Sequence, residues 1–211
     1  MRNIKNIGDV ETLPVDVIIK EPVRENMRVL FSHIGRYVIA ARKLNIRKTD
    51  RILDASCGEG YGSYYLSTLA EKVYGIDVSE ENLEYARKHF GVHNISFLKY
   101  FDFLRRKTKI DKVVCIETLE HVDKDNSPLF IRRLVRTLRS GGDMFLTVPI
   151  GENAPSDYNP FHKNEPSIDV IYNSFIPYFS KIDIEISSFV NSYGEKTNFA
   201  LVTMFNKGGK V

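Results

Sequence analysis

The sequence predicts an α/β fold: a mostly parallel sheet of seven strands, with helices on both faces and an antiparallel hairpin at the C-terminal end. Between residues 46 and 150, short apolar segments alternate with amphipathic helical patterns, which is typical of parallel strands joined by helices. Near the end of the chain, two apolar segments flank Asn191-Ser192-Tyr193-Gly194, which indicates a hairpin. The first strand runs into a glycine-rich turn, at the edge where such sheets bind ligands.

Each element is predicted from its periodicity and from the residues at its ends. The predicted strands are residues 51–55, 72–76, 95–99, 112–116 and 143–148, followed by the hairpin strands 181–189 and 199–205. The predicted helices are residues 21–44, 62–70, 79–89, 128–139 and 168–178. Ser79, followed by two acids, is typical of a capped helix start. Gly141-Gly142 predicts the end of the helix over residues 128–139.

Composition limits the class of protein. The chain has 211 residues, enough for one domain with a substantial core, and its net charge of +3 does not by itself argue for a nucleic-acid partner. No apolar run approaches the ~20 residues that a membrane span needs. The first twenty residues lack a signal-peptide core, and Cys57 and Cys115 are expected to be free thiols. We therefore expect a cytoplasmic protein.

The glycine turn is the most informative segment of the chain. The first strand ends in Asp54 and is followed by Gly58, Gly60 and Gly62. Glycine accepts a positive φ and lets the backbone approach a ligand closely. The next strand ends in Asp77, and an acid at that position can hold a ribose diol. The turn therefore predicts a ligand that contains a nucleoside.

Glycine spacing separates two ligand classes. A dinucleotide fold expects G-x-G-x-x-G, whereas this turn reads Gly58-x-Gly60-x-Gly62 and is preceded by Asp54 and Cys57. That arrangement resembles motif I of the class I S-adenosylmethionine (SAM) methyltransferases, although Ser56 stands where the family usually has glycine. The resemblance implies a Rossmann-like fold, SAM as the cofactor and an enzyme that transfers methyl groups.

The resemblance covers nearly the whole chain. Residues 73–79 look like motif II, residues 101–103 like the acidic position near the adenine amine, and residues 111–122 like motif IV. Ser32-His33-Ile34-Gly35-Arg36-Tyr37 resembles a lead-in whose arginine can reach the SAM carboxylate. The cofactor-binding residues that the resemblance implies are Arg36, Asp54, Ser56, Cys57, Gly58, Gly60, Asp77, Val78, Asp102, Phe103 and Ile116.

The same resemblance divides the single domain, residues 1–211, into four parts. They are an N-terminal segment with a lid helix (1–45), a SAM-binding core (46–150), a substrate loop and helix (151–180) and the terminal hairpin (181–211). The substrate loop contains Asn159-Pro160-Phe161-His162-Lys163-Asn164-Glu165, which resembles the N-P-F-H-x-x-E stretch of methyltransferases that act in sugar and small-metabolite pathways. Loops often carry binding residues, so this one is expected to cover the methyl-transfer site.

Glu117, Glu120 and His121 form an E-x-x-E-H string after the fourth strand. On the first turn of a helix, these side chains would share one face. The string resembles that of the ubiquinone-biosynthesis O-methyltransferases and of small-RNA 2′-O-methyltransferases, in which a later histidine completes a metal shell, here His162. The resemblance implies Mg²⁺ or Mn²⁺ on these four residues. Without metal, His121 or His162 could act as a general base, and methyl transfer can also proceed by alignment alone.

The function predicted is SAM-dependent transfer of a methyl group to a hydroxyl of a small metabolite or sugar-type substrate, with His121, His162 and Glu117 as the catalytic candidates. Two alternatives stay open: a metal-assisted RNA 2′-O-methyltransferase, and a catalytically silent methyltransferase-like binding subunit. The modest net charge argues against nucleic acid, and the intact glycine turn argues against the silent subunit. The partner expected is a small molecule, and the sequence leaves a homodimer open.

Overall fold

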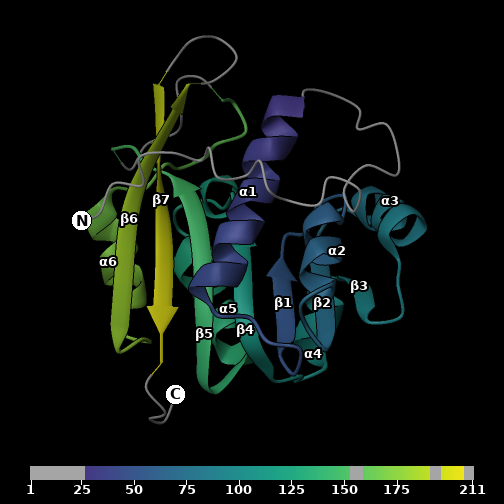
Figure 1. The fold of residues 1–211 in the computed structure, drawn as a ribbon. Helices are drawn as coiled ribbons and strands as arrows, with labels where there is room; N and C mark the ends of the chain where they lie inside the picture. The colour runs from purple at the N-terminus through teal and green to yellow at the C-terminus, as the bar shows by residue number, and fades with distance from the viewer. Residues whose placement is uncertain (1–26, 153–158, 191–195, 207–211) are drawn as a thin grey trace.

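A computed structural model describes residues 27–152, 159–190 and 196–206. Its centre is one seven-stranded sheet in the order β3-β2-β1-β4-β5-β7-β6 (Figure 1). The first five strands are parallel, β7 is antiparallel to β5, and β6 is antiparallel to β7. The strands are β1 (Arg51–Ala55), β2 (Lys72–Asp77), β3 (Ile95–Lys99), β4 (Ile110–Ile116), β5 (Leu138–Pro149), β6 (Lys181–Val190) and β7 (Lys196–Phe205).

Helices cover both faces of the sheet. They are α1 (Met27–Lys43), α2 (Tyr61–Ser67), α3 (Glu80–Phe90), α4 (Tyr100–Arg105), α5 (Ser127–Thr137) and α6 (Ile168–Phe175), with a 3₁₀ turn, η3 (Leu119–His121), after β4. In Figure 1, α1 crosses in front of the sheet and α5 lies behind it. No helix among the described residues is long and apolar enough to cross a bilayer.

Two apolar cores lie on the two faces of the sheet, because successive side chains of a strand point to opposite sides. In β1, Ile52 packs in the core with the α1 and α2 side chains, and its neighbour Leu53 packs in the core with the α5 and α6 side chains. In β4, Val114 and Val113 divide in the same way. The central strands are therefore buried on both faces, as expected for a parallel sheet that helices cover on both sides.

The predicted fold class is confirmed, including the C-terminal antiparallel strands. The prediction that Gly141-Gly142 ends the helix over residues 128–139 is wrong, because α5 ends at Thr137 and β5 begins at Leu138. Leu138 already pairs with Ile110 of β4, so sheet pairing takes over before the glycines are reached. The short helix α4 was not predicted. The predicted hairpin turn 191–194 lies outside the described residues, as do residues 21–26 of the first predicted helix.

The order of the strands opens the sheet beside β1. The chain moves from β1 through β2 to β3 on one side and then returns to β4 on the other side of β1. The helices that follow β1 and β4 therefore lie on opposite faces, and the carboxyl ends of these strands face an open crevice. Asp54, Asp77 and Glu117 all lie at or just after these carboxyl ends. The fold thus gathers the acids that the sequence singled out.

Helix α1 is anchored over the glycine turn by Tyr37. The Tyr37 hydroxyl donates to Asp54 Oδ1 at 3.1 Å, and the Ser63 hydroxyl donates to Asp54 Oδ2 at 2.6 Å. The ring of Tyr37 lies directly against the Cα of Gly62 at the start of α2. A side chain at position 62 would overlap this ring, so Gly62 is required for close packing rather than for ligand binding.

We expect Gly62→Ala to destabilise the fold by about 1–3 kcal/mol, because the added methyl group would displace the buried Tyr37 ring. Urea unfolding followed by circular dichroism measures the change in the free energy of unfolding. In a Tyr37→Ala background, the same substitution should cost much less, since the overlapping ring is gone. An equal loss in both backgrounds would contradict the contact.

Burial raises the pKa of Asp54 from 3.8 to about 7, even though Ser63 and Tyr37 donate hydrogen bonds to its carboxylate. Between these two pH values, the folded protein retains a proton that the unfolded chain releases. The contribution of Asp54 to stability is therefore largest at low pH and is lost as the pH rises through this window. Asn cannot ionise, so Asp54→Asn removes this dependence.

The free energy of unfolding of Asp54→Asn minus that of the wild type should increase by at most about 4 kcal/mol from pH 4 to pH 8. This limit corresponds to a shift of about three pKa units. Urea unfolding of both proteins across this pH range measures the difference. If the difference in the free energy of unfolding between the two proteins is the same at every pH, then folding does not raise the pKa of Asp54, and the prediction is contradicted.

Candidate functional site

The turn after β1 has three residues with a positive φ: Ser56 at 64°, Gly58 at 52° and Gly60 at 91°. A positive φ favours glycine, so a glycine would suit position 56. Ser56 has a side chain and is therefore strained in this conformation. At Gly58 a Cβ would meet no atom within 4 Å, so this side of the turn faces open space. At Gly60 a Cβ would lie 2.6 Å from that of Ala86, so this glycine serves packing.

Asp77 holds this turn in place. Its Oδ2 accepts a hydrogen bond from the Gly58 amide at 2.9 Å, and its Oδ1 accepts one from the Ser79 amide at 2.9 Å. Ser79 in turn caps α3 by accepting from the Asn82 amide at 3.2 Å. A carboxylate has about four acceptor positions, so each oxygen keeps capacity for a ligand hydroxyl.

A pocket of about 520 Å³ lies beside Asp77, within the usual size range of small-molecule sites. Val78 is 77% exposed and Phe101 is 54% exposed at its wall, so both offer apolar surface to a flat ring. The lining residues are Ser56, Asp77, Val78, Tyr100, Phe101, Thr118, His121, Val122, Asp123, Asn126, Leu129, Phe130 and Arg133. The pocket is therefore bounded by the carboxyl ends of β1, β2 and β4 and by the first turns of α4 and α5.

Some of the predicted cofactor residues reach this pocket and others do not. Ser56, Asp77 and Val78 line it, and Gly58 bonds to Asp77. Four others are buried and do not line it, namely Asp54, Cys57, Gly60 and Ile116. Asp54 and Gly60 shape the turn from behind, and burial raises the pKa of the Cys57 thiol, which keeps it protonated.

Asp102, the acid that was predicted to bind the cofactor after β3, does not line this pocket. The side chain of Asp102 is exposed and pairs with Arg105 at 3.3 Å. Phe103 is buried in the core that contains the α5 and α6 side chains. The neighbouring residues Tyr100 and Phe101 line the pocket instead. This segment forms the helix α4, which turns successive side chains about 100° apart, so a shift of one residue changes which side chain faces the ligand.

Arg36, which is buried, forms an ion pair with the partly buried Glu117. Their side chains approach to 3.5 Å, and the guanidinium group of Arg36 lies 4.7 Å from the centre of the Phe199 ring. Glu117 has a φ of 46°, a strained conformation for a residue other than glycine. His33 lies beside them, and burial followed by the charge of Arg36 lowers its pKa to about 4, so His33 is neutral near pH 7.

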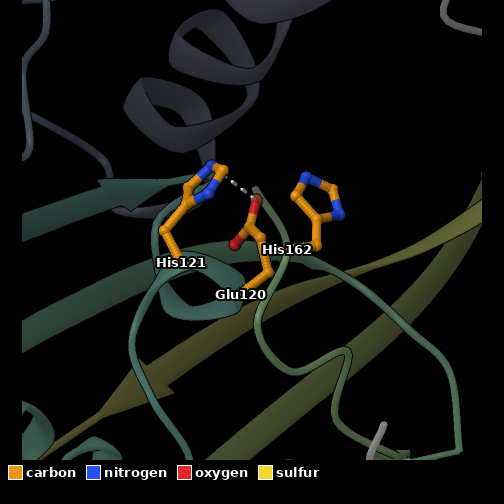
Figure 2. A group of neighbouring side chains, drawn as sticks. All are labelled: Glu120, His121 and His162. Carbon is orange, nitrogen blue, oxygen red and sulfur yellow. Dashed lines mark ion pairs between the residues drawn. The ribbon is translucent and has the colours of Figure 1, made fainter. Parts of the chain in front are cut away.

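Three residues predicted as metal ligands or bases converge, and one does not. One potential ligand atom from each of Glu120, His121 and His162 lies within 4.8 Å of the others (Figure 2). Glu117 is outside this group, and its carboxylate is directed to Arg36. The expected helical turn across residues 117–121 is absent: the 3₁₀ turn begins only at Leu119, so Glu117 does not share its face.

The loop that carries His162 is fastened to η3 by backbone hydrogen bonds. The Glu120 carbonyl accepts from the amides of Lys163 at 2.8 Å and Asn164 at 3.2 Å. His121 Nδ1 lies 2.9 Å from the Phe161 carbonyl oxygen, and the rings of His121 and His162 are 5.0 Å apart. These contacts bring two histidines together from positions about forty residues apart in the sequence.

Glu120 is an unusual group in this cluster. Its side chain is fully buried, and neither carboxylate oxygen has a hydrogen-bond partner among the described residues. Burial, with the neighbouring charge of Glu117, raises the pKa of Glu120 well above its ordinary value. A buried carboxyl in this state stays protonated unless a positive charge is brought to it. The cluster can therefore take either protons or a cation.

His121 links the two parts of the site. It lines the 520 Å³ pocket and also belongs to the cluster with Glu120 and His162. Sequence reasoning identified this residue but missed Phe101, Arg133 and Glu165. The first two reach the pocket only through the packing of α4 beside α5, which no local pattern encodes. Glu165 was visible as part of the N-P-F-H-x-x-E stretch, but the residue that it contacts was not.

Comparisons with known proteins agree with this geometry. Residues 52–142 match the methyltransferase domain family. A probable S-adenosylmethionine-dependent methyltransferase of Mycobacterium tuberculosis is 25% identical over 146 residues, which cover 67% of this chain and 53% of that protein. A ubiquinone biosynthesis O-methyltransferase of Pelagibacter ubique is 30% identical over 146 residues, with coverage of 58% and 60%. The chain thus spans little more than half the length of these relatives.

Solved structures show the same fold. The YcgJ protein of Bacillus subtilis superimposes with a TM-score of 0.62 at 15% sequence identity, covering 84% of this chain and 100% of that one. The sheet order is that of these structures, and the domain match and the related sequences support a class I S-adenosylmethionine-dependent methyltransferase.

Proposed function

We propose that the protein transfers the methyl group of SAM to a hydroxyl group of a small metabolite or sugar-type substrate. The observation that carries this proposal is the position of His121, which borders both the pocket beside Asp77 and the cluster with Glu120 and His162. A donor in the pocket and an acceptor at the cluster would meet there. The ubiquinone biosynthesis relative is named an O-methyltransferase, which supports a hydroxyl acceptor.

The residues at the pocket fit the parts of SAM. Asp77 retains acceptor capacity for a ribose diol, and Val78 and Phe101 offer apolar surface to adenine. Arg36 and Glu117 carry opposite charges, as does the amino-acid end of SAM, so each could meet its complement there. We therefore assign Arg36 to the carboxylate and Glu117 to the ammonium group. SAM supplies a methyl group on a sulfonium, which is already activated for displacement.

The histidine cluster supplies the acceptor side of the reaction. A neutral imidazole of His121 or His162 can take the proton of a hydroxyl as its oxygen attacks the methyl carbon. Alignment of the two reactants provides much of the acceleration in such a displacement. The modest net charge again argues against RNA.

Cation-assisted transfer to a vicinal diol is a second candidate, favoured by the buried carboxylate of Glu120, which lacks a hydrogen-bond partner among the described residues. One carboxylate and two imidazoles form a donor set that suits Mn²⁺ or Zn²⁺ better than Mg²⁺, which prefers oxygen ligands. A cation held by Glu120, His121 and His162 would lower the pKa of a bound hydroxyl. Glu117 is not part of this set.

We expect Asp77→Ala to weaken S-adenosylhomocysteine binding by about 100-fold, since about 3 kcal/mol is lost with two hydrogen bonds to a charged acceptor. Asp102→Ala is the matched control: it removes an exposed carboxylate outside the pocket and should leave the affinity unchanged. Isothermal titration calorimetry measures both affinities. Equal losses in the two variants, with the fold retained by circular dichroism, would contradict the assignment of Asp77.

The cation-assisted mechanism predicts that Mn²⁺ binds to the metal-stripped protein and that Glu120→Gln weakens this binding at least about tenfold. Glu117→Gln should retain it, because Glu117 is outside the donor set. The affinity should rise with pH, since Glu120 must release its proton first. Calorimetric titration across pH 6 to 8 measures these effects. Absence of Mn²⁺ binding in the wild type would leave the histidines as bases alone.

A further inference from the structure

We propose that Glu165 is a positioning residue, which holds His162 in the tautomer that leaves Nε2 free to accept a proton. His162 Nδ1 lies 2.7 Å from Glu165 Oε1, and both side chains are about four-fifths buried. A carboxylate at this position accepts a hydrogen bond, so the ring proton of neutral His162 is held on Nδ1. This inference rests on the proposed function, because it assigns the free nitrogen to the acceptor hydroxyl.

The neighbouring histidine is held in the same way. His121 Nδ1 lies 2.9 Å from the Phe161 carbonyl oxygen, and a carbonyl can only accept, so its ring proton is also on Nδ1. With both Nδ1 atoms occupied, each ring leaves Nε2 as its acceptor. Nε2 of His121 lies 3.9 Å from Glu120 Oε1, within the cluster (Figure 2). In the same view, one ring nitrogen of His162 lies on the side that faces Glu120, and the other lies on the far side of the ring.

The end of β5 is built to accommodate Glu165. A Cβ at Gly151 would lie 3.0 Å from Glu165 Cβ, 3.2 Å from its Oε2 and 3.3 Å from its carbonyl oxygen. The Gly151 amide also donates to the Pro166 carbonyl at 3.3 Å. The backbone therefore passes close beside Glu165 on one side, while the Glu120 carbonyl fixes Lys163 and Asn164 on the other. Glu165 is constrained from both sides, unlike a surface ion pair, whose side chains are free to move.

The chemical step that Glu165 supports can be written in full. The acceptor oxygen forms a bond to the methyl carbon, and the carbon–sulfur bond breaks with its electron pair going to sulfur. S-adenosylhomocysteine is the neutral thioether that leaves. The hydroxyl proton passes to His162 Nε2, which makes an imidazolium beside the Glu165 carboxylate, and it is later released to water. Glu165 touches no reacting atom, so its role is to orient the ring and to face the positive charge.

The tautomer of His162 tests this inference in the metal-free full chain without an acceptor. Two-bond ¹H–¹⁵N correlation spectra of ¹⁵N-histidine-labelled protein identify which ring nitrogen carries the proton, and loss of one spin system in His162→Asn assigns the signal. We expect the Nδ1–H form in the wild type and in Glu165→Gln, whose amide oxygen still accepts. Glu165→Ala should lose this preference. Asp169→Ala, which removes an exposed carboxylate from α6, is the matched control and should not change the spectrum.

Two results would overturn the inference: an Nε2–H tautomer in the wild type, or an unchanged Nδ1–H tautomer in Glu165→Ala. S-adenosylhomocysteine titration separates these failures from failure of the proposed function. Glu165→Ala should bind this ligand as the wild type does, because Glu165 does not line the pocket beside Asp77. A wild type that binds no S-adenosylhomocysteine would refute the proposed function while the tautomer result stood. With an accepted substrate, Glu165→Ala should lower kcat at least about tenfold at an unchanged KM for SAM.

Discussion

The carboxylate of Asp77 is the contact on which the cofactor side of the molecule depends. It joins the amide of Gly58, in the turn after β1, to the amide of Ser79, at the start of α3. Two neighbouring strand ends are thereby fixed to each other through a single charged group. Hydrogen bonds to a charged acceptor are about twice as strong as those between neutral groups. The bond to Gly58 helps to hold the turn that contains Ser56 in its strained conformation.

The residues of the proposed acceptor side are held together by contacts between distant parts of the sequence. Its residues come from η3 and from a loop about forty residues later, and the Glu120 carbonyl joins them through the amides of Lys163 and Asn164. The chain between them forms α5 and β5, which are fixed by the core. The proposed cofactor side is thus set by adjacent turns, and the proposed acceptor side by long-range contacts between η3 and this loop.

This difference explains how far the sequence could predict the site. Gly58, Asp77 and the Ser79 cap could be singled out because each stands in a βα turn, where spacing and residue type are informative, but the bond between Gly58 and Asp77 joins two turns and was not predicted. Asp102 and Phe103 do not line this pocket, whereas Tyr100 and Phe101 do, because the segment forms the helix α4, which was not predicted. The pairing of Glu117 with Arg36 depends on the packing of α1 over the sheet, which periodicity predicts only in outline. Glu165 was in a recognised motif, but its partnership with His162 needed the folded loop.

The distribution of buried charge supports placing the site at this edge. Among the described residues, five charged side chains are buried: Arg36, Asp50, Asp54, Asp77 and Glu120. Asp50 lies just before β1 and is explained by its bonds within the turn that begins at Arg47. The other four lie around the carboxyl ends of β1, β2 and β4, whereas the rest of the core is almost entirely apolar. Ionisable groups that burial perturbs gather at functional sites, which supports placing the site at this edge. Under the proposed function, a zwitterionic, diol-bearing cofactor would contact Arg36 and Asp77, and a proton-releasing acceptor would lie beside Glu120, whereas Asp54 is already bonded to Tyr37 and Ser63.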